Sequence, residues 1–209
     1  MDADSEQYIL LLLSDGNLPT GSFVTSSGLE SYVKHGFLAA TSYGEAEKAT
    51  DFMRYSLESY SSSALPFVTD THHVVSRTSA ANGSDQGLDR CLQRIAQLDA
   101  LYDAMTLNHV TKRASRAQGV ALLTLFSKGF IRPKWLTSED SDKTGLSLAG
   151  SSVEQLINRL KLETRQGKTH GHLPICWGVL TAALGLSAGQ RCLAFSAMLS
   201  YPPIASFRA

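Results

Sequence analysis

The sequence predicts an all-α protein, a single-domain helical bundle of about eight helices. Apolar residues recur along most of the chain at steps of three and four, which is the spacing of one helical face. Several segments begin with S-x-x-[EQ], the pattern of a capping box that satisfies free N–H groups of the first turn. Convincing strand alternation is absent. The 209 residues suffice for the core of one domain, residues 1–209.

The first four expected helices span residues 6–14, 26–36, 43–61 and 64–78. An apolar run at residues 9–13 marks the first helix, and Ser27 with Glu30 fits a capping box of the second. The third helix begins at the capping pair Ser42 and Glu45. The fourth is expected to start at Ser63, because the proline at position 66 is tolerated in a first turn. One face of the third helix carries Ala46, Ala49, Met53, Leu57 and Tyr60.

The last four expected helices span residues 87–105, 107–127, 151–162 and 172–199, the last one broken near Gly185. Capping pairs begin at Ser151 and Ser187, and a segment rich in glycine, proline and charge at about 127–150 is expected to be a long loop. The first of these helices carries an apolar stripe of Leu88, Leu92, Ile95, Leu98, Tyr102 and Met105. The next carries a stripe of Leu107, Val110, Ala114, Ala117 and Ala121.

Composition restricts the class of function. The chain has 19 basic and 19 acidic residues, and this lack of a basic excess predicts no nucleic-acid partner. The apolar run at residues 9–13 is far shorter than the roughly 20 residues that cross a membrane, so no membrane association is expected. The N-terminus is acidic, and Cys91, Cys176 and Cys192 are widely spaced. These features predict a cytoplasmic protein without a disulfide framework.

The segment LLLLSDGNLPTGSF at residues 10–23 has the glycine spacing of a nucleotide-binding P-loop, G-x-x-x-x-G-K-[ST]. However, Ser22 stands where the phosphate-binding lysine belongs. Pro19 also removes a backbone N–H from the phosphate cradle. We therefore interpret the segment as a Gly/Pro turn between two helices, with P-loop-like nucleotide binding as the alternative.

One local group of residues has the chemistry of a metal site: His170, His172 and Cys176. A helix beginning at His172 would place Cys176 one turn away on the same face. The competing interpretation is a loop with ordinary histidines and a cysteine that packs as a small hydrophobe. His72 and His73, adjacent on a helix, point about 100° apart and so do not face one site. No nucleophile–base arrangement is present, so no catalytic residue is assigned.

Three blocks resemble the urease accessory protein F (UreF) family, in its eukaryotic branch of plant and fungal members. They are LLSDGNLPTGSFVTSSGLESYVKHGFL (12–38), LDALYDAMTLNHVTKRASRAQGVALL (98–123) and HGHLPICWGVLTAALGLS (170–187). The residues on the family signature are Asp15, Pro19, Thr20, Gly21, Phe23, Ser26, Gly28, Glu30, Arg113 and Gly119. The family continues with a further helix and a C-terminal tail. This chain instead reads FSAMLSYPPIASFRA at 195–209, so we expect the usual tail to be missing.

The resemblance implies an all-α, homodimeric protein that is not an enzyme. It implies a chaperone or scaffold that bridges a nickel-carrying GTPase (UreG-like) and a urease-docking accessory protein (UreD/UreH-like), and that regulates the GTPase so that Ni²⁺ reaches apo-urease. The signature residues would then have structural and interface roles. No cofactor is expected to be tightly bound, since the complex would handle nickel transiently. The alternative is a metallochaperone that binds nickel directly through His170, His172 and Cys176.

Overall fold

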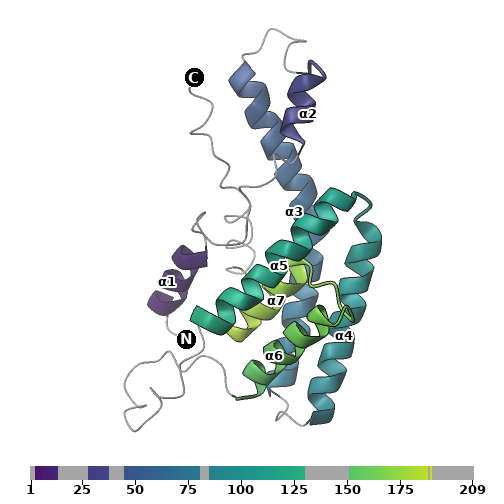
Figure 1. Ribbon diagram of the computed structural model, residues 1–209. Coiled ribbons are helices and arrows are strands. Elements are labelled where there is room, and N and C mark those ends of the chain that lie inside the picture. Colours follow the sequence, from purple (N-terminus) through teal and green to yellow (C-terminus); the bar gives the residue numbers. More distant parts are fainter. Residues whose placement is uncertain are drawn as a thin grey trace.

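The computed structural model of the chain describes residues 3–13, 28–37, 45–80, 85–129, 151–187 and 189. These residues form seven α-helices and no strand, which confirms the predicted all-α class (Figure 1). The helices are α1 (Ala3–Leu13), α2 (Leu29–Lys34), α3 (Glu45–Ala80), α4 (Asp85–Met105), α5 (His109–Gly129), α6 (Ser151–Arg165) and α7 (Leu173–Ala183).

Helix α7 lies in the middle of the bundle, where both α3 and α5 pack against it (Figure 1). Every residue of α7 except Ala182 is buried. The sequence of α7 is apolar around its circumference, as expected for a helix that is enclosed on all sides. Buried apolar residues of α1, α3, α4, α5 and α6 join those of α7 in one core.

Helix α3 continues without a break from Glu45 to Ala80, so the predicted helix start at Ser63 is wrong. Pro66 lies inside the helix, where it lacks the N–H that would bond to the Ser62 carbonyl. Pro66 and Ser62 are both exposed, so water can bond to that carbonyl. The hydroxyl groups of the serines at 61–63 donate to carbonyls one turn earlier. The helix tolerates the proline because the lost hydrogen bond falls on its solvent side.

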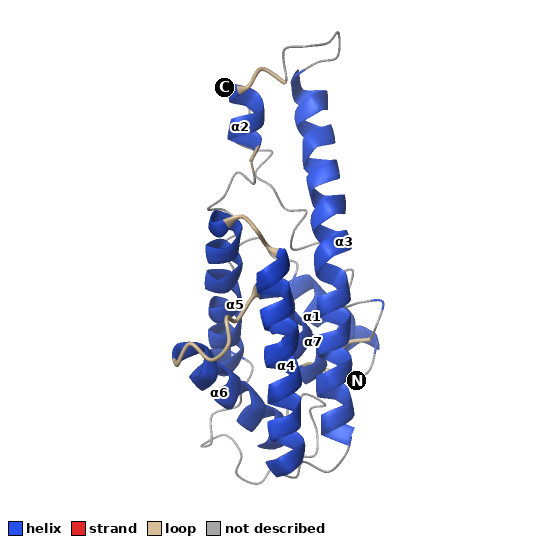
Figure 2. Cartoon of the chain, turned by 90° about the vertical axis from the view of Figure 1, so that its right-hand side faces the viewer, coloured by secondary structure: helices blue, strands red, loops and turns tan. Residues whose placement is uncertain are grey.

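Helix α2 is shorter than the predicted helix at 26–36 and begins after Gly28. Gly28 is the N-cap with a φ of 95°, a left-handed conformation that glycine adopts readily. Glu30 is therefore the second helical residue rather than the third, and the predicted capping box of Ser27 and Glu30 is wrong. Helix α2 lies beside the N-terminal half of α3, where the Tyr32 and Phe52 rings are 4.7 Å apart between centroids (Figure 2).

The predicted apolar stripes on α4 and α5 have opposite outcomes. On α4 the stripe is buried as predicted, except that Met105 at the helix end is 56% exposed. The stripe predicted around α5 faces solvent at Leu107, which is 90% exposed, at Val110, which is 52% exposed, and at Ala117. The buried face of α5 is the opposite one, formed by Ser115, Gly119, Leu122, Leu123 and Phe126.

Other expectations are met at the ends of elements. Helix α6 begins at Ser151 as predicted, and Gly185, with a φ of 69°, follows the end of α7.

The burial of two cysteines and two histidines is also defined. Cys91 and Cys176 are free and buried. His72 is buried while His73 is exposed, in agreement with their predicted divergence.

Two predicted segments lie mainly or wholly outside the described residues: the loop at about 127–150, of which only residues up to 129 belong to α5, and the C-terminus at 195–209. Within the described part of the chain, no helix combines the length and apolar character that crossing a membrane demands.

Helix α7 approaches α3 closely at Gly178. A Cβ atom at this position would lie 2.7 Å from the Thr71 Cβ and 2.7 Å from the Val68 carbonyl oxygen. We expect Gly178→Ala to lower the free energy of unfolding by about 2 kcal/mol, because overpacking against helix backbone outweighs the better helix propensity of alanine. Urea unfolding followed by circular dichroism measures the change. A variant as stable as the wild type would contradict this account of the contact.

Candidate functional site

A polar cluster in the protein interior joins α4, α5 and the loop that leads into α7. Helix α4 contributes Asp99 and Asp103, α5 contributes Ser115, and the loop contributes the segment His170–His172. Asp99, Ser115 and His172 are almost completely buried, at 1%, 3% and 0% exposure. Because isolated polar groups are costly to bury, each of these side chains needs partners within the protein.

Asp99 binds the backbone of the loop. Its carboxylate accepts hydrogen bonds from the N–H groups of His170, Gly171 (2.9 Å) and His172 (3.0 Å). Gly171 has a φ of 71°, and the left-handed turn at this residue accompanies the convergence of the three N–H groups on one carboxylate. The negative charge also lies at the N-terminus of α7, where the helix dipole favours an anion.

His172 is held between two helices by both nitrogens of its ring. Nε2 lies 3.0 Å from the Asp103 Oδ1, and Nδ1 lies 3.1 Å from the Ser115 Oγ. The Ser115 oxygen also accepts the N–H of Leu173 at 3.1 Å. All three contacts are satisfied together when His172 is neutral: Nε2–H donates to Asp103, and the Ser115 hydroxyl donates to Nδ1.

Asp103 is the carboxylate that the positively charged side chains around the cluster contact. Besides His172, its carboxylate accepts hydrogen bonds from Lys112 at 3.1 Å and from Arg116, while the His170 Nε2 lies 3.9 Å away. Burial alone would raise the pKa of Asp103, but the hydrogen bonds from His172, Arg116 and Lys112 outweigh it and hold that pKa well below its usual value. For His172 burial is the dominant influence, and it lowers the pKa despite the neighbouring carboxylates.

Gly119 allows α5 to approach the same loop. A Cβ atom on Gly119 would overlap the Gly171 carbonyl oxygen and would lie 3.0 Å from the Cys176 Sγ. Burial, together with the charge of Asp99, raises the pKa of the Cys176 thiol well above its usual value. Gly119 therefore has a packing role, since a side chain at this position would collide with the loop. Cys176, which lies next to Gly119, is a buried and protonated thiol.

The other predicted site residues are not brought into this cluster. Glu30 belongs to α2 and Gly28 caps it, and α2 lies beside the N-terminal half of α3, apart from the cluster (Figures 1 and 2). Arg113 is exposed on the outer side of α5. Outside the described residues lie Asp15, Pro19, Thr20, Gly21, Phe23 and Ser26. Interface roles for all these residues stay predictions.

The structure assigns other partners to the predicted metal ligands. Both ring nitrogens of His172 make hydrogen bonds, so metal binding there would break the contact with Asp103 or with Ser115. Binding through Cys176 would require deprotonation of a thiol whose pKa is raised. Among the described residues no group of three or more His, Cys, Asp or Glu side chains is arranged to hold a metal ion. A nickel site at His170, His172 and Cys176 stays a prediction.

Sequence reasoning missed the role of the two aspartates. Asp99 lies among the buried positions of the α4 stripe, next to Leu98, and a carboxylate at a core position is a signal that it has polar partners inside. Asp103 gives no such signal, because its pairing with Lys112 and Arg116 depends on how the chain turns between α4 and α5.

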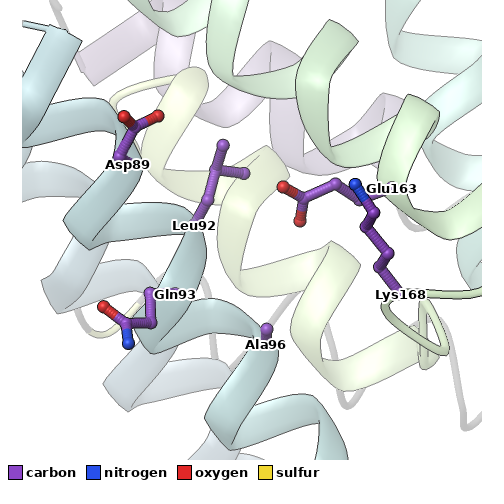
Figure 3. A pocket seen from close by; sticks show the side chains of 6 residues that line it. All are labelled: Asp89, Leu92, Gln93, Ala96, Glu163 and Lys168. Atoms are coloured by element: carbon purple, nitrogen blue, oxygen red, sulfur yellow. The ribbon is translucent and has the colours of Figure 1, made fainter.

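A separate hollow of about 400 Å³ opens between α4 and the end of α6. Figure 3 shows four residues of α4 on one side of the hollow, with Glu163 of α6 and Lys168 of the following turn on the other side. The four are Asp89, Leu92, Gln93 and Ala96. The hollow mixes both signs of charge around an apolar wall and shares no residue with the polar cluster.

We expect Asp99→Asn to destabilise the protein by about 3 kcal/mol, because an amide group turns an N–H₂ toward backbone N–H donors and removes hydrogen bonds to a charged acceptor. Asp89→Asn is the matched control. Asp89 is an exposed carboxylate on the same helix, paired with Arg159 at 2.7 Å, and such a pair contributes under about 1 kcal/mol. Urea unfolding of the three proteins gives the comparison, and equal losses in the two variants would refute the role assigned to Asp99.

Stability should also depend on pH through His172. Its pKa in the fold lies below the usual 6.5, so the unfolded chain binds the extra proton first as the pH falls. The free energy of unfolding should therefore decline between about pH 7 and pH 5, and His172→Gln should show a smaller decline. The lowered pKa of Asp103 adds a further loss below its usual 3.8. Urea unfolding from pH 7 down to about pH 3 tests both contributions. Identical pH profiles of the wild type and His172→Gln between about pH 7 and pH 5 would contradict the assignment to His172.

Comparison with known proteins identifies related sequences. Urease accessory protein 6 of Cryptococcus neoformans var. grubii is 40% identical over 205 residues, covering 87% of this chain and 63% of that protein. A urease accessory protein UreF-like of Schizosaccharomyces pombe is 27% identical over 194 residues, covering 93% of this chain and 67% of that protein. The chain thus spans about two thirds of the length of these relatives. No solved structure matches it.

The UreF family model matches residues 44–199, which contain helices α3 to α7 and the whole polar cluster. The matched range includes two of the three sequence blocks that resemble the family, residues 98–123 and residues 170–187. The Cryptococcus relative is a fungal protein and supports the predicted eukaryotic branch. This chain belongs to the UreF family of urease accessory proteins.

Proposed function

We propose that this protein is a non-enzymatic scaffold of urease maturation. It bridges a nickel-carrying GTPase of the UreG type and a urease-docking accessory protein of the UreD/UreH type, and it regulates the GTPase during nickel insertion into apo-urease. Membership in the UreF family carries this proposal. In the proposal the protein works as a homodimer in the cytoplasm, holds no cofactor tightly and lets the complex handle nickel transiently.

The acceptor oxygens of the polar cluster are occupied by hydrogen bonds within the protein, and this supports a structural role for the cluster. The Asp99 carboxylate accepts three loop N–H groups, and the Ser115 oxygen is shared between His172 and Leu173. Asp103 is surrounded by three donors. A general base or nucleophile has to present a free lone pair to substrate, whereas these groups hold the loop and α7 in place.

A second candidate is direct nickel binding, and one observation favours it. The His170 side chain is 37% exposed, and its Nε2 lies 3.9 Å from Asp103, an acceptor that would orient an imidazole ligand. Calorimetry with Ni²⁺ on the wild type and on His170→Ala and His172→Ala separates the candidates. Heat of binding that both variants lose supports direct binding, whereas equally small heats in all three proteins leave only the scaffold.

The test of the scaffold is reconstitution. We expect the protein to form a stoichiometric complex with the GTPase and the docking protein of the same organism in size-exclusion chromatography, and deletion of its gene to abolish activation of apo-urease. Asp89→Asn serves as a surface control that should restore activation fully. Normal urease activation in the deletion strain would refute the proposal.

A further inference from the structure

Helix α5 presents an apolar stripe to solvent. Val110 is 52% exposed and Val120 is 41% exposed, Ala117 is exposed, and Ala114 and Ala121 are half-buried. We call these five residues the outer face of α5. The solvent side of a surface helix normally carries charged and polar residues. The deeply buried residues of α5 lie on the opposite side, while Val120, at the edge of the outer face, adjoins the loop at Gly171. The outer face is therefore an apolar surface that contributes little to the core.

The outer face has the shape of a helix-docking surface. Its residues run along α5 for about 17 Å from Val110 to Ala121, which is three helical turns. Three of the five are alanines, and small side chains at a contact let the axes of two helices come close together. The C-terminal part of this stretch lies beside α6 (Figure 1), so α6 provides one border of the surface.

The border of the outer face is positively charged. Helix α5 contains no Asp or Glu in its 21 residues. Lys112 and Arg116 pair with Asp103, but Arg113, next to the outer face, and Lys128 at the end of the helix are exposed. Helix α6 adds Lys161, whose Nζ donates to the Ser127 Oγ at 2.7 Å, and Arg165.

Lys161 is repelled by two other cations of this border, Arg165 and Lys128. Burial lowers the pKa of Lys161, and the charges of Arg165 and Lys128 lower it further. The acidic residue on the same side of α6 is Glu154, about two helical turns away from Lys161. Carboxylates brought in by another molecule would relieve this repulsion.

We propose that the outer face of α5 binds an amphipathic helix of a partner protein, with small apolar residues on its contact side and Asp or Glu residues at its edges. Carboxylates at one end of that helix pair with Arg113, and those at the other end pair with Lys128, Lys161 and Arg165. A second copy of α5 would place cations against cations. An RNA strand would meet alanine and valine, where such surfaces usually offer aromatic rings for stacking.

Site-specific photo-crosslinking in the cells that make the protein tests the occupant. The full chain carries a benzophenone amino acid in place of Ala117. The matched control carries it in place of Thr111, which is exposed on the same helix about 120° around the axis. We expect position 117, and not position 111, to cross-link to a peptide of another protein that has apolar residues at helical spacing and a net negative charge.

Every other result overturns the proposal: a cross-link to a second copy of this chain, to RNA, to lipid or to a basic peptide, or no cross-link above that of position 111. Identification of a protein outside urease maturation would weaken the proposed scaffold function but not the assignment of the outer face. Absence of the cross-link at position 117, together with normal binding of the urease accessory proteins, would refute the assignment of the outer face and leave the scaffold function standing.

Affinity of the full chain for a synthetic copy of the cross-linked peptide provides the second measurement. We expect Ala117→Arg and Arg113→Glu each to raise Kd about tenfold or more, since one obstructs the contact and the other reverses its charge. Thr111→Arg and Arg90→Glu are matched exposed controls and should bind as the wild type does. Circular dichroism verifies that all four variants are folded. Wild-type affinity in both outer-face variants would refute the proposal.

Discussion

The carboxylate of Asp99 determines where the central helix of this protein begins. By accepting three consecutive backbone N–H groups, it sets the path of the loop at residues 170–172. The next N–H, that of Leu173, bonds to Ser115. Two different helices, α4 and α5, thus supply the acceptors that the start of α7 lacks within itself. Because α7 is enclosed by α3 and α5, the placement of its first turn is linked to the packing of the whole core.

The same cluster balances the charges of its two carboxylates. Two carboxylates in or near the interior would repel each other, but Asp99 is paired with backbone dipoles and Asp103 with Lys112 and Arg116. His172 connects to Asp103 while remaining neutral, so it adds a directional hydrogen bond rather than another charge. This arrangement stabilises one geometry of the loop between α6 and α7, and it explains why a polar cluster persists in a bundle of apolar helices.

Much of the fold could be predicted from the sequence where one face of a helix is clearly apolar. Helix α4 is such a case, with Leu88, Leu92, Ile95, Leu98 and Tyr102 all buried. Helix α5 has two candidate faces, and the more regular apolar one points outward. The face that packs inward includes Gly119 and Ser115, which hydrophobicity alone does not favour. They are selected by a close approach to the loop, and that is a tertiary constraint which no local pattern shows.

The candidate site was predictable only in part for the same reason. His172 was singled out for its metal-binding chemistry, but its partners come from residues 57 and 69 positions earlier in the chain. Pro66 shows that secondary structure, too, depends on the surroundings of a residue. Whether a proline ends a helix depends on whether the carbonyl that it leaves unpaired meets solvent or protein, and position 66 faces solvent. Both outcomes depend on the surroundings of a residue rather than on its neighbours in sequence.

Asp99 recognises the loop through main-chain atoms, and this has a consequence for how the family can diverge. The side chain at position 170 contributes nothing to those three hydrogen bonds, so it is free to change without loss of the loop's path. Positions 99, 119 and 171 have no such freedom, because a carboxylate, the absence of a side chain and a left-handed turn are each needed there. Sequence variation in this region should therefore concentrate on the half-exposed side chain at 170, where a new surface chemistry can arise on an unchanged backbone.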